Sequence, residues 1–386
     1  MFVSDFNAEW LEHPFLRNQK LIRSDEEVVR TAACGIDSVY IDTQRGLDAD
    51  DMPTAEEAAQ ELEETLVGVF AGDTNSTPSF ADSVTEARQV IGSARRALRE
   101  LLSSVRLGRS IDFPAATETA RQLALGAARH PHACLLLGRL NRSDDYTFRH
   151  SVNVALILGI FSRSQQLPED TVQALALGGI LHDVGKMAVP VGILNKPSML
   201  DAGEMQAMRE HVSSGVRLVS APEGALEAAA FDVIAEHHER CDGTGYPHGL
   251  KGDAISLGGR MGGIIDVYDA LTSDRVYRRA INPAESIRKM FEWAERHFDR
   301  NLTHAFIKTV GIYPAGSLLR LESGRIGVVL RQGEQSLMAP VVRVIYDTHR
   351  MAFVTPVDVE LAKTADRVVS HEAPEKWNIP LERFID

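Results

Sequence analysis

The chain contains 386 residues, of which 44% are hydrophobic and 25% are charged, and this composition is typical of a globular protein with a sizeable core. Its 41 Lys and Arg residues are outnumbered by 54 Asp and Glu residues, and the formal net charge of −13 argues against broad binding to DNA or to anionic membranes. The three cysteines are far apart and form no CxxC pair, which argues against a disulfide framework and a thiolate zinc site.

The location of the protein is predicted from the absence of membrane signals in the sequence. The run MFVSDFNAEWLEHPFL at 1–16 has early acidic residues and lacks a basic region followed by an apolar one, so it does not resemble a signal peptide. No stretch reaches the roughly 18 uninterrupted apolar residues of a membrane span. We therefore expect no membrane span and a cytoplasmic location.

A small α+β accessory domain is predicted at the N-terminus, over residues 1–125. The run SVYID at 38–42 is rich in β-forming residues and predicts a strand, whereas a short element at 9–16 is broken at Pro14. Between residues 46 and 87 there is no Lys or Arg, and acidic residues cluster there. This segment is therefore predicted to be a linker with one acidic helix.

An amphipathic helix is predicted over residues 87–108, where apolar residues recur at helical spacing and five arginines mark the wetter face. A basic helix of this kind can touch a membrane surface. We favour a packing helix whose basic face meets an acidic neighbour, and a dimer contact stays open as an alternative.

The central region is predicted to be helical, and the C-terminal region β-rich. Segments 175–186 and 257–273 are apolar helices rich in small residues, which suit close packing around a buried site. Residues 317–333 alternate in polarity and predict two strands joined at 322–324, and later runs continue the pattern. The expected fold class is therefore mainly α, with a central all-helical domain, a small α+β N-terminal domain and a small β-rich C-terminal region. The predicted domain bounds are 1–125, 126–315 and 316–386.

Histidine and aspartate residues recur on the otherwise apolar helices of the central region. A buried imidazole or carboxylate needs a partner, and both groups are natural ligands of first-row divalent cations. Separately hydrogen-bonded core histidines are the alternative, but one adjacent His-Asp pair and one adjacent His-His pair make that explanation less favourable. The candidate metal ligands are His150, His182, Asp183, His211, His237, His238 and Asp266.

Asp183 and Lys186 are the candidate catalytic residues. Adjacent ligands on a helix lie about 100° apart, so the pair 182–183 fits a helix end or a position between two metals, where Asp183 can bridge them. A two-metal site activates water and neutralises phosphoryl oxygens. Lys186 follows nearly one turn later, so its ammonium can reach the same cleft. The alternative for Lys186 is an ordinary surface lysine at a helix end.

Two further features fit a phosphate ligand. Arg275 and Arg278 lie three residues apart after the helix that carries Asp266, so they can share a face and contact phosphate oxygens. Solvated arginines are the alternative. The run DGTGYP at 242–247 is a glycine-rich loop that permits a tight approach to a ligand, and it is also compatible with a purely structural turn.

These residues resemble the HD-GYP family, a bacterial branch of the HD phosphohydrolases. The resemblance rests on LHDVGK at 181–186 and HHERCDGTGYP at 237–247, with ILNKPSML at 193–200 and DVYDALTSDRVYR at 266–278 between or after them. It covers roughly residues 126–315, and the joint occurrence is far more specific than a lone His-Asp pair. The N-terminal runs HPFL and VYID also resemble a small domain of uncharacterised role that commonly precedes such domains.

The resemblance implies an all-helical HD-type metal-dependent phosphohydrolase domain that acts as a phosphodiesterase of cyclic di-GMP in bacterial signalling. It implies two or three metal ions, with iron or manganese as the usual candidates and other divalent ions open. Hydrolysis would give linear pGpG, followed by slower cleavage to GMP. A homodimer and a diguanylate-cyclase (GGDEF) partner are further partners left open.

The family pattern also implies roles for individual residues. The seven candidate ligands match its metal-binding positions, and Asp183 matches the bridging carboxylate. Tyr246 belongs to the signature loop, whose role is more structural than chemical. The residues that match positions in contact with substrate are Lys186, Asp269, Arg275 and Arg278.

One departure from the family pattern concerns the number of metals. Members with three metals carry a glutamate four residues before the first ligand histidine, and here that position is Tyr146. A phenol with a pKa near 10 is a poor ligand at neutral pH. We therefore predict two metal ions per chain.

Three other functions stay open from the sequence. The protein could be an effector that binds cyclic di-GMP or another protein with little turnover, or an HD phosphohydrolase of another cyclic dinucleotide or nucleotide. A structural scaffold with incidental histidines is the third. Metal content and turnover distinguish these alternatives.

Overall fold

The chain folds as two units, Met1–Val69 and Phe70–Asp386. The computed structural model describes residues 1–6, 19–34, 36, 38–47, 80–140, 146–196, 198–220, 226–273, 280–294, 296–333 and 336–385. The short element predicted at 9–16 and most of the predicted acidic linker lie outside these residues. The three-part division at 125/126 and 315/316 stays a prediction.

In its described residues, the N-terminal unit contains a small antiparallel sheet and one helix. Its sheet has the order β2-β1-β3, so the first strand pairs with both others. Val3, Phe6, Ile22 and Ile36 form its buried core. Its elements are β1 (Phe2–Asp5), β2 (Lys20–Leu21), α1 (Asp25–Ala33) and β3 (Tyr40–Ile41), the last of which confirms the predicted strand in SVYID.

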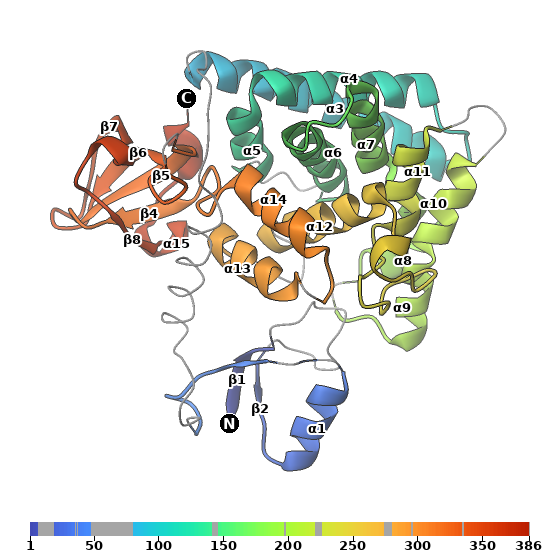
Figure 1. Cartoon of the computed structure of the whole chain (residues 1–386), viewed down its shortest axis with the longest axis horizontal. Coiled ribbons are helices and arrows are strands. Elements are labelled where there is room, and N and C mark those ends of the chain that lie inside the picture. The colour runs from blue at the N-terminus through green and yellow to red at the C-terminus, as the bar shows by residue number, and fades with distance from the viewer. Residues whose placement is uncertain are drawn as a thin grey trace. The chain divides into compact units, whose positions relative to one another are not determined.

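The second unit is a helical bundle followed by a sheet (Figure 1). Its helical part confirms the predicted mainly α class. The helices are α3 (Phe80–Arg106), α4 (Phe113–Arg129), α5 (Pro131–Leu140), α6 (Tyr146–Ser164), α7 (Glu169–Leu181), α8 (Val191–Leu194), α9 (Ala202–Arg209), α10 (His211–Val219), α11 (Ala228–Glu236), α12 (Leu257–Thr272), α13 (Pro283–Trp293) and α14 (Arg300–Val310), with 3-10 turns η1 (Val184–Ala188) and η2 (Gly252–Ala254).

Helix α3 is longer than the predicted helix at 87–108 and begins at Phe80. Its buried stripe starts with Val84 and continues through Ala87, Ile91 and Leu98, so the apolar spacing extends one turn before the basic run that marked the helix in the sequence. In Figure 1 the helix lies alongside α4 across one side of the bundle, and it also packs on α5, α6 and η1. This arrangement confirms that the helix packs on its neighbours, and the acidic neighbour expected for its basic face stays a prediction.

Two of the predicted central helices differ in their outcome. The helix predicted at 257–273 is confirmed as α12, and Ser256 caps it by accepting a hydrogen bond from the Gly259 N–H group at 2.9 Å. The helix predicted at 175–186 is wrong in its second half, because α7 ends at Leu181 and the separate turn η1 follows. This break places His182 and Asp183 at the helix end.

The C-terminal region forms a five-stranded antiparallel sheet with the order β7-β6-β5-β4-β8. The two strands predicted within 317–333 are confirmed as β4 and β5, and Leu318 pairs with Val328 in their register. The elements are β4 (Leu318–Leu321), β5 (Arg325–Arg331), β6 (Val341–Asp347), β7 (Ala352–Glu360), β8 (Val368–His371), the helix α15 (Pro374–Trp377), and the turns η3 (Leu361–Lys363) and η4 (Leu381–Phe384).

The bundle and the C-terminal sheet share one hydrophobic core. Leu136 of α5 belongs to the same buried cluster as Val328 of β5 and Leu381 of η4. The sheet is therefore packed on the helices and is part of the same unit. Among the described residues, no helix combines the length and the apolar character needed to cross a membrane.

Candidate metal centre

The seven candidate ligands come from five places in the bundle that are far apart in sequence. His150 lies on α6, and Asp266 lies on α12. The others lie at helix boundaries: His182 and Asp183 follow α7, His211 begins α10, and His237 and His238 follow α11. Residues at helix ends are free to aim side chains along the helix axis as well as away from it, so three helix termini and two helix faces meet at one place.

The side chains of these residues converge in the described structure. The Nε2 atom of His150 lies 2.9 Å from Asp266 Oδ1 and 3.3 Å from His182 Nε2. The Oδ2 atom of Asp183 lies 3.3 Å from His182 Nε2, and its Oδ1 atom lies 3.5 Å from His211 Nε2. The side chains of His150, His182, Asp183 and His211 are each 2% exposed or less, and that of Asp266 is 11% exposed. The candidates therefore form one buried cluster.

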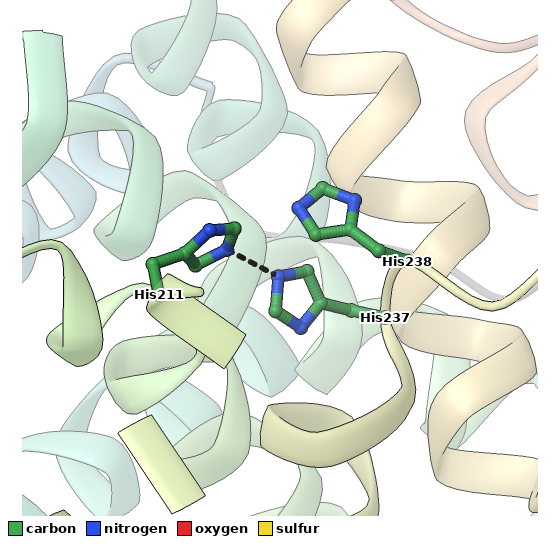
Figure 2. A group of neighbouring side chains, drawn as sticks. All are labelled: His211, His237 and His238. Carbon is green, nitrogen blue, oxygen red and sulfur yellow. Dashed lines mark hydrogen bonds between the residues drawn. The ribbon is translucent and has the colours of Figure 1, made fainter. Parts of the chain in front are cut away.

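The imidazoles of His211, His237 and His238 face one another on the second side of this cluster (Figure 2). The Nε2 atoms of His211 and His237 lie 3.5 Å apart. The rings of His237 and His238 have centroids 4.2 Å apart. Three nitrogen atoms at such spacing can be bridged by a single cation.

Three ligand groups fit a metal ion by the proximity of their donor atoms. One is His211, His237 and His238, and another is His150, His182 and Asp266; in each, the donor atoms lie within 4.8 Å of one another. These two groups share no residue. The third joins Asp183 to His182 of one group and His237 of the other. Asp183 is thus placed between the other two groups, as a bridging carboxylate requires.

Backbone hydrogen bonds set the orientation of three imidazoles. The Nδ1–H group of His182 donates to the Gly179 carbonyl at 2.8 Å, that of His211 to Met208 at 2.7 Å, and that of His237 to Val233 at 3.0 Å. Each bond assigns the proton to Nδ1 and leaves the Nε2 lone pair directed into the cluster. Metal-binding histidines commonly have this kind of outer support.

His150 is held by a carboxylate instead. Its Nδ1 atom lies 2.7 Å from Asp269 Oδ2, and the Asn153 amide donates to Asp269 Oδ1 at 2.9 Å. Burial lowers the pKa of His150, but hydrogen bonds to Asp266 and Asp269 outweigh it and raise the pKa to about 9. A cation that binds here must displace the proton shared with Asp266. The contacts of Asp269 suit a residue that positions His150, and its predicted contact with substrate stays a prediction.

The pKa shifts of His211, His237 and Asp183 favour the protonation states that metal ligands need. Burial lowers the pKa of His211 to about 4 and that of His237 to about 3, so both rings are neutral near pH 7. Burial raises the pKa of Asp183, but the positive charge of Lys186 and the contacts with His182 hold it well below its usual range. Its Oδ1 atom is buried and, among the described residues, accepts no hydrogen bond. A cation would satisfy this oxygen atom.

Lys186 lies on η1 and reaches the cluster. Its ammonium donates to Asp183 Oδ2 at 2.5 Å, and its side chain is 21% exposed. Gly185 permits this placement, because a Cβ atom there would lie 1.9 Å from the His211 carbonyl oxygen and 2.4 Å from the Gly215 nitrogen. The close approach of η1 to α10 therefore requires glycine at this position and brings Lys186 and His211 to opposite sides of Asp183.

The signature loop at 242–247 lies against His238, which belongs to the group of His211, His237 and His238. Tyr246 stacks on His238 with ring centroids 4.6 Å apart. The Arg209 guanidinium lies 5.1 Å from the centroid of the Tyr246 ring. Glu239, which is 4% exposed, accepts hydrogen bonds from the His248 and Leu250 N–H groups at 2.7 and 2.8 Å. This buried carboxylate ties the loop to the residues that follow α11.

The tightness of the loop depends on Gly245. A Cβ atom there would lie 2.4 Å from the Arg240 nitrogen and 2.5 Å from Glu239 Cα. The loop therefore passes so close to the ligand segment that no side chain fits. This contact fixes Tyr246 over His238 and supports the structural role that was expected for the motif.

Some predicted site residues lie outside the described part of the chain. Arg275 and Arg278 belong to this group, and their predicted contacts with phosphate stay predictions. The side chain of Tyr146, on which the predicted number of metals rests, is also outside it. The sequence analysis did not find Asn153 and Glu239, which support His150 and the signature loop. Glu239 directly follows the histidine pair 237–238, and this position could have indicated a role at the site. The sequence around Asn153 gives no comparable indication.

The fold and this cluster define a helical domain with a buried site for divalent cations. Residues 134–302 match the family described as HD domain, and residues 1–116 match a domain of unknown function, DUF3391. Cyclic di-GMP phosphodiesterase PA4108 of Pseudomonas aeruginosa is 41% identical over 382 residues, which are 98% of this chain and 91% of that protein. The chain belongs to the HD-domain family, with a DUF3391 domain at its N-terminus.

Other relatives match a smaller part of the chain. The 3'3'-cGAMP-specific phosphodiesterase 2 of Vibrio cholerae is 35% identical over 42% of this chain and 31% of that protein. The cyclic di-GMP phosphodiesterase response regulator RpfG of Xanthomonas campestris is 32% identical over 45% of this chain and 47% of that protein.

Proposed function

We propose that the protein is a metal-dependent phosphodiesterase that hydrolyses cyclic di-GMP. The observation that supports this most strongly is the convergence of four histidines and two aspartates, with His238 beside them, in one buried cluster next to a lysine. The relative in Pseudomonas aeruginosa, named as a cyclic di-GMP phosphodiesterase, is similar over nearly its whole length. Chemistry and similarity therefore agree on the class of reaction.

We propose two divalent cations per chain, with iron or manganese as the leading candidates. The group of His211, His237 and His238 would hold one, and the group of His150, His182 and Asp266 the other. Asp183 lies between the groups and would contact both. When bound, such a pair of cations activates water and neutralises phosphoryl oxygens. Imidazole and carboxylate ligands suit several metals, and so the other divalent ions stay open.

The remaining roles belong to residues around the cluster. Lys186 would stabilise the negative charge that develops on the phosphoryl group, because its ammonium lies beside Asp183 and is partly exposed. Arg275 and Arg278 would orient the second phosphate of the substrate, and Asp269 keeps His150 in place. The expected product is linear pGpG, with slower cleavage to GMP.

The wider organisation is proposed from the sequence. It comprises an accessory domain over 1–125, a catalytic domain over 126–315 and a C-terminal region over 316–386, in a cytoplasmic protein. A homodimer and a diguanylate-cyclase partner are the partners to test, by light scattering and by co-purification respectively.

The direct test is turnover of cyclic di-GMP by protein loaded with Fe(II) or Mn(II), with chromatography of the products. Formation of pGpG supports the proposal. Binding of cyclic di-GMP without turnover would instead make the protein an effector. The same assay on the metal-free protein is the matched control.

A second substrate, 3'3'-cGAMP, is favoured by one observation, the 35% identity to a phosphodiesterase named for that dinucleotide. The two cyclic dinucleotides differ in one base and present the same phosphodiester to the cations. Parallel measurements of kcat/KM on both decide between them. We expect the higher value for cyclic di-GMP.

A further inference from the structure

His238 differs from the other four candidate imidazoles in what holds its ring. Each of the other rings has a hydrogen bond from Nδ1 to a backbone carbonyl or to a carboxylate. The ring of His238 makes no hydrogen bond to any described residue, and its Nδ1 atom lies 3.9 Å from Asp266 Oδ2. Its side chain is 15% exposed, which is more than any of the other four. The direction of this ring therefore depends on contacts other than hydrogen bonds.

The stack on Tyr246 is the contact that can fix the ring. The two centroids lie 4.6 Å apart and the two planes are 25° from parallel. The same tyrosine meets His211 only edge-on, at 6.5 Å and 81°. A close stacked neighbour restricts the imidazole, because turning the ring would push its edge into the phenol ring. The tyrosine thus limits the directions in which His238 can offer a nitrogen lone pair.

Tyr246 is itself held firmly beside His238. Its backbone N–H group donates to the His238 carbonyl at 3.1 Å. Gly245, next to it, lies so close to the Glu239 Cα that no side chain fits there. The phenol hydroxyl forms no hydrogen bond within the described part of the chain, so the tyrosine acts on the histidine through its ring.

Arg209 adds a cation to the same stack. It is the last residue of α9, two positions before His211 begins α10. Its guanidinium lies 5.1 Å from the Tyr246 centroid, a distance typical of a cation–π contact. The side chain is exposed and, among the residues that the structure describes, has no hydrogen bond or ion pair. The tyrosine ring is therefore the group that engages this guanidinium.

We propose that Tyr246 and Arg209 are positioning residues of the metal centre. Tyr246 directs His238 toward the cation held by His211, His237 and His238, and Arg209 steadies the tyrosine ring. The stack then gives this ligand the outer support that hydrogen bonds give to the others. This inference rests on the metal centre of the proposed function.

The first test is calorimetric titration of metal-free protein with Mn(II). We expect Tyr246→Leu to weaken the affinity for one cation roughly 10- to 100-fold, as is usual when outer support of a ligand is lost. Tyr246→Phe keeps the ring and is expected to leave the affinity unchanged. Equal losses in the two variants would assign the effect to the hydroxyl and overturn the inference. Unchanged affinity in Tyr246→Leu would overturn it as well.

A double-mutant cycle distinguishes positioning from a general structural role. His238→Asn removes the imidazole, and the Mn(II) affinity that remains is then measured with and without Tyr246→Leu. If the tyrosine acts through the histidine, the second substitution has no further effect in this background. Losses that add up would show that Tyr246 supports the fold around the centre and would overturn the inference.

Arg209→Gln tests the outer member of the stack. We expect a decrease in Mn(II) affinity of roughly 2- to 5-fold, because an exposed cation–π contact is weak, and no decrease in the Tyr246→Leu background. Arg217→Gln is the matched control, since this arginine on α10 is also exposed and donates to Ser214 Oγ at 2.7 Å. Equal affinities in the two arginine variants would refute the role of Arg209.

These titrations need no turnover, so they separate the inference from the proposed reaction. Wild-type protein that takes up no Mn(II) would refute the metal centre and the positioning roles together. Turnover of cyclic di-GMP by wild-type protein, with equal Mn(II) affinities in wild type and Tyr246→Leu, would refute the positioning roles alone. Mn(II) affinity that depends on the Tyr246 ring in a protein without turnover would refute the hydrolase and support the stack.

Discussion

The metal centre of the bundle and the C-terminal sheet both contain buried histidine nitrogens, but in different surroundings. In the bundle, His182 and His237 have ring centroids 4.9 Å apart, and carboxylates lie beside them. On β8 of the sheet, both ring nitrogens of His371 are buried and have no hydrogen-bond partner in the described part of the chain. Its ring instead lies 5.1 Å from that of Tyr313. Burial alone therefore does not identify a site, whereas convergence with carboxylates does.

The largest effect is expected where the two ligand groups meet. Asp183→Asn removes the charge between them with little change in shape, so we expect turnover of cyclic di-GMP to fall at least about 1,000-fold and metal content to fall. Metal analysis and turnover on the same sample measure both. If the variant lacked metal and kept full activity, the histidine cluster of the bundle would not be a metal centre needed for turnover, and the contrast with His371 of the sheet would fail.

Lys186→Ala separates catalysis from metal binding within the centre. The lysine contacts Asp183 but is no metal ligand, so its loss should leave metal content unchanged. We expect kcat to fall about 100-fold, as when one group that stabilises transition-state charge is removed. An equal decrease in metal content and in activity would show that Lys186 acts through the cations.

Asp269→Asn tests the support of His150 from outside the ligand groups. The substitution weakens the carboxylate contact that orients the imidazole, so we expect metal affinity to fall about 10- to 100-fold. Competition with a chelator measures this affinity. Asp253→Asn is the matched control, because the Asp253 side chain is fully exposed and forms an ion pair with Arg260 at 3.2 Å, and the substitution should have no effect.

The smallest effect is expected at the isolated histidine of the sheet. Burial lowers the pKa of His371 to about 4, so the unfolded chain binds this proton more readily than the folded protein. Stability is therefore lost as the pH falls from about 6.5 towards 4, by about 1–3 kcal/mol, and is unaffected by this group at higher pH. His371→Phe should reduce this loss in thermal unfolding measured across that range, without changing metal content. An identical pH profile in the variant would contradict the interpretation.

Local patterns predicted much of the fold and of the candidate site. Alternation in 317–333 predicted β4 and β5, and the spacing of apolar residues predicted α12. The candidate ligands were recognisable because His and Asp are rare in apolar helices unless they have partners. The strand and helix patterns are local in sequence. The candidate ligands stand out because few buried positions tolerate His or Asp without a partner.

The rest depended on contacts between distant residues. Helix α7 ends at Leu181, and Gly185 then passes so close to the His211 carbonyl that no side chain fits there, a contact that no spacing in 175–186 reveals. Asp269 contacts His150 across 119 positions, so the sequence suggested a substrate contact and gave no sign of this partner.

The most direct test of the central claim is metal analysis of wild-type protein purified without oxygen, with turnover of cyclic di-GMP measured on the same sample. Convergence of the seven side chains predicts about two ions per chain and hydrolysis that scales with their occupancy. Protein that holds no metal under these conditions and still hydrolyses the dinucleotide would contradict the account. Three tightly held ions per chain would contradict the predicted pair.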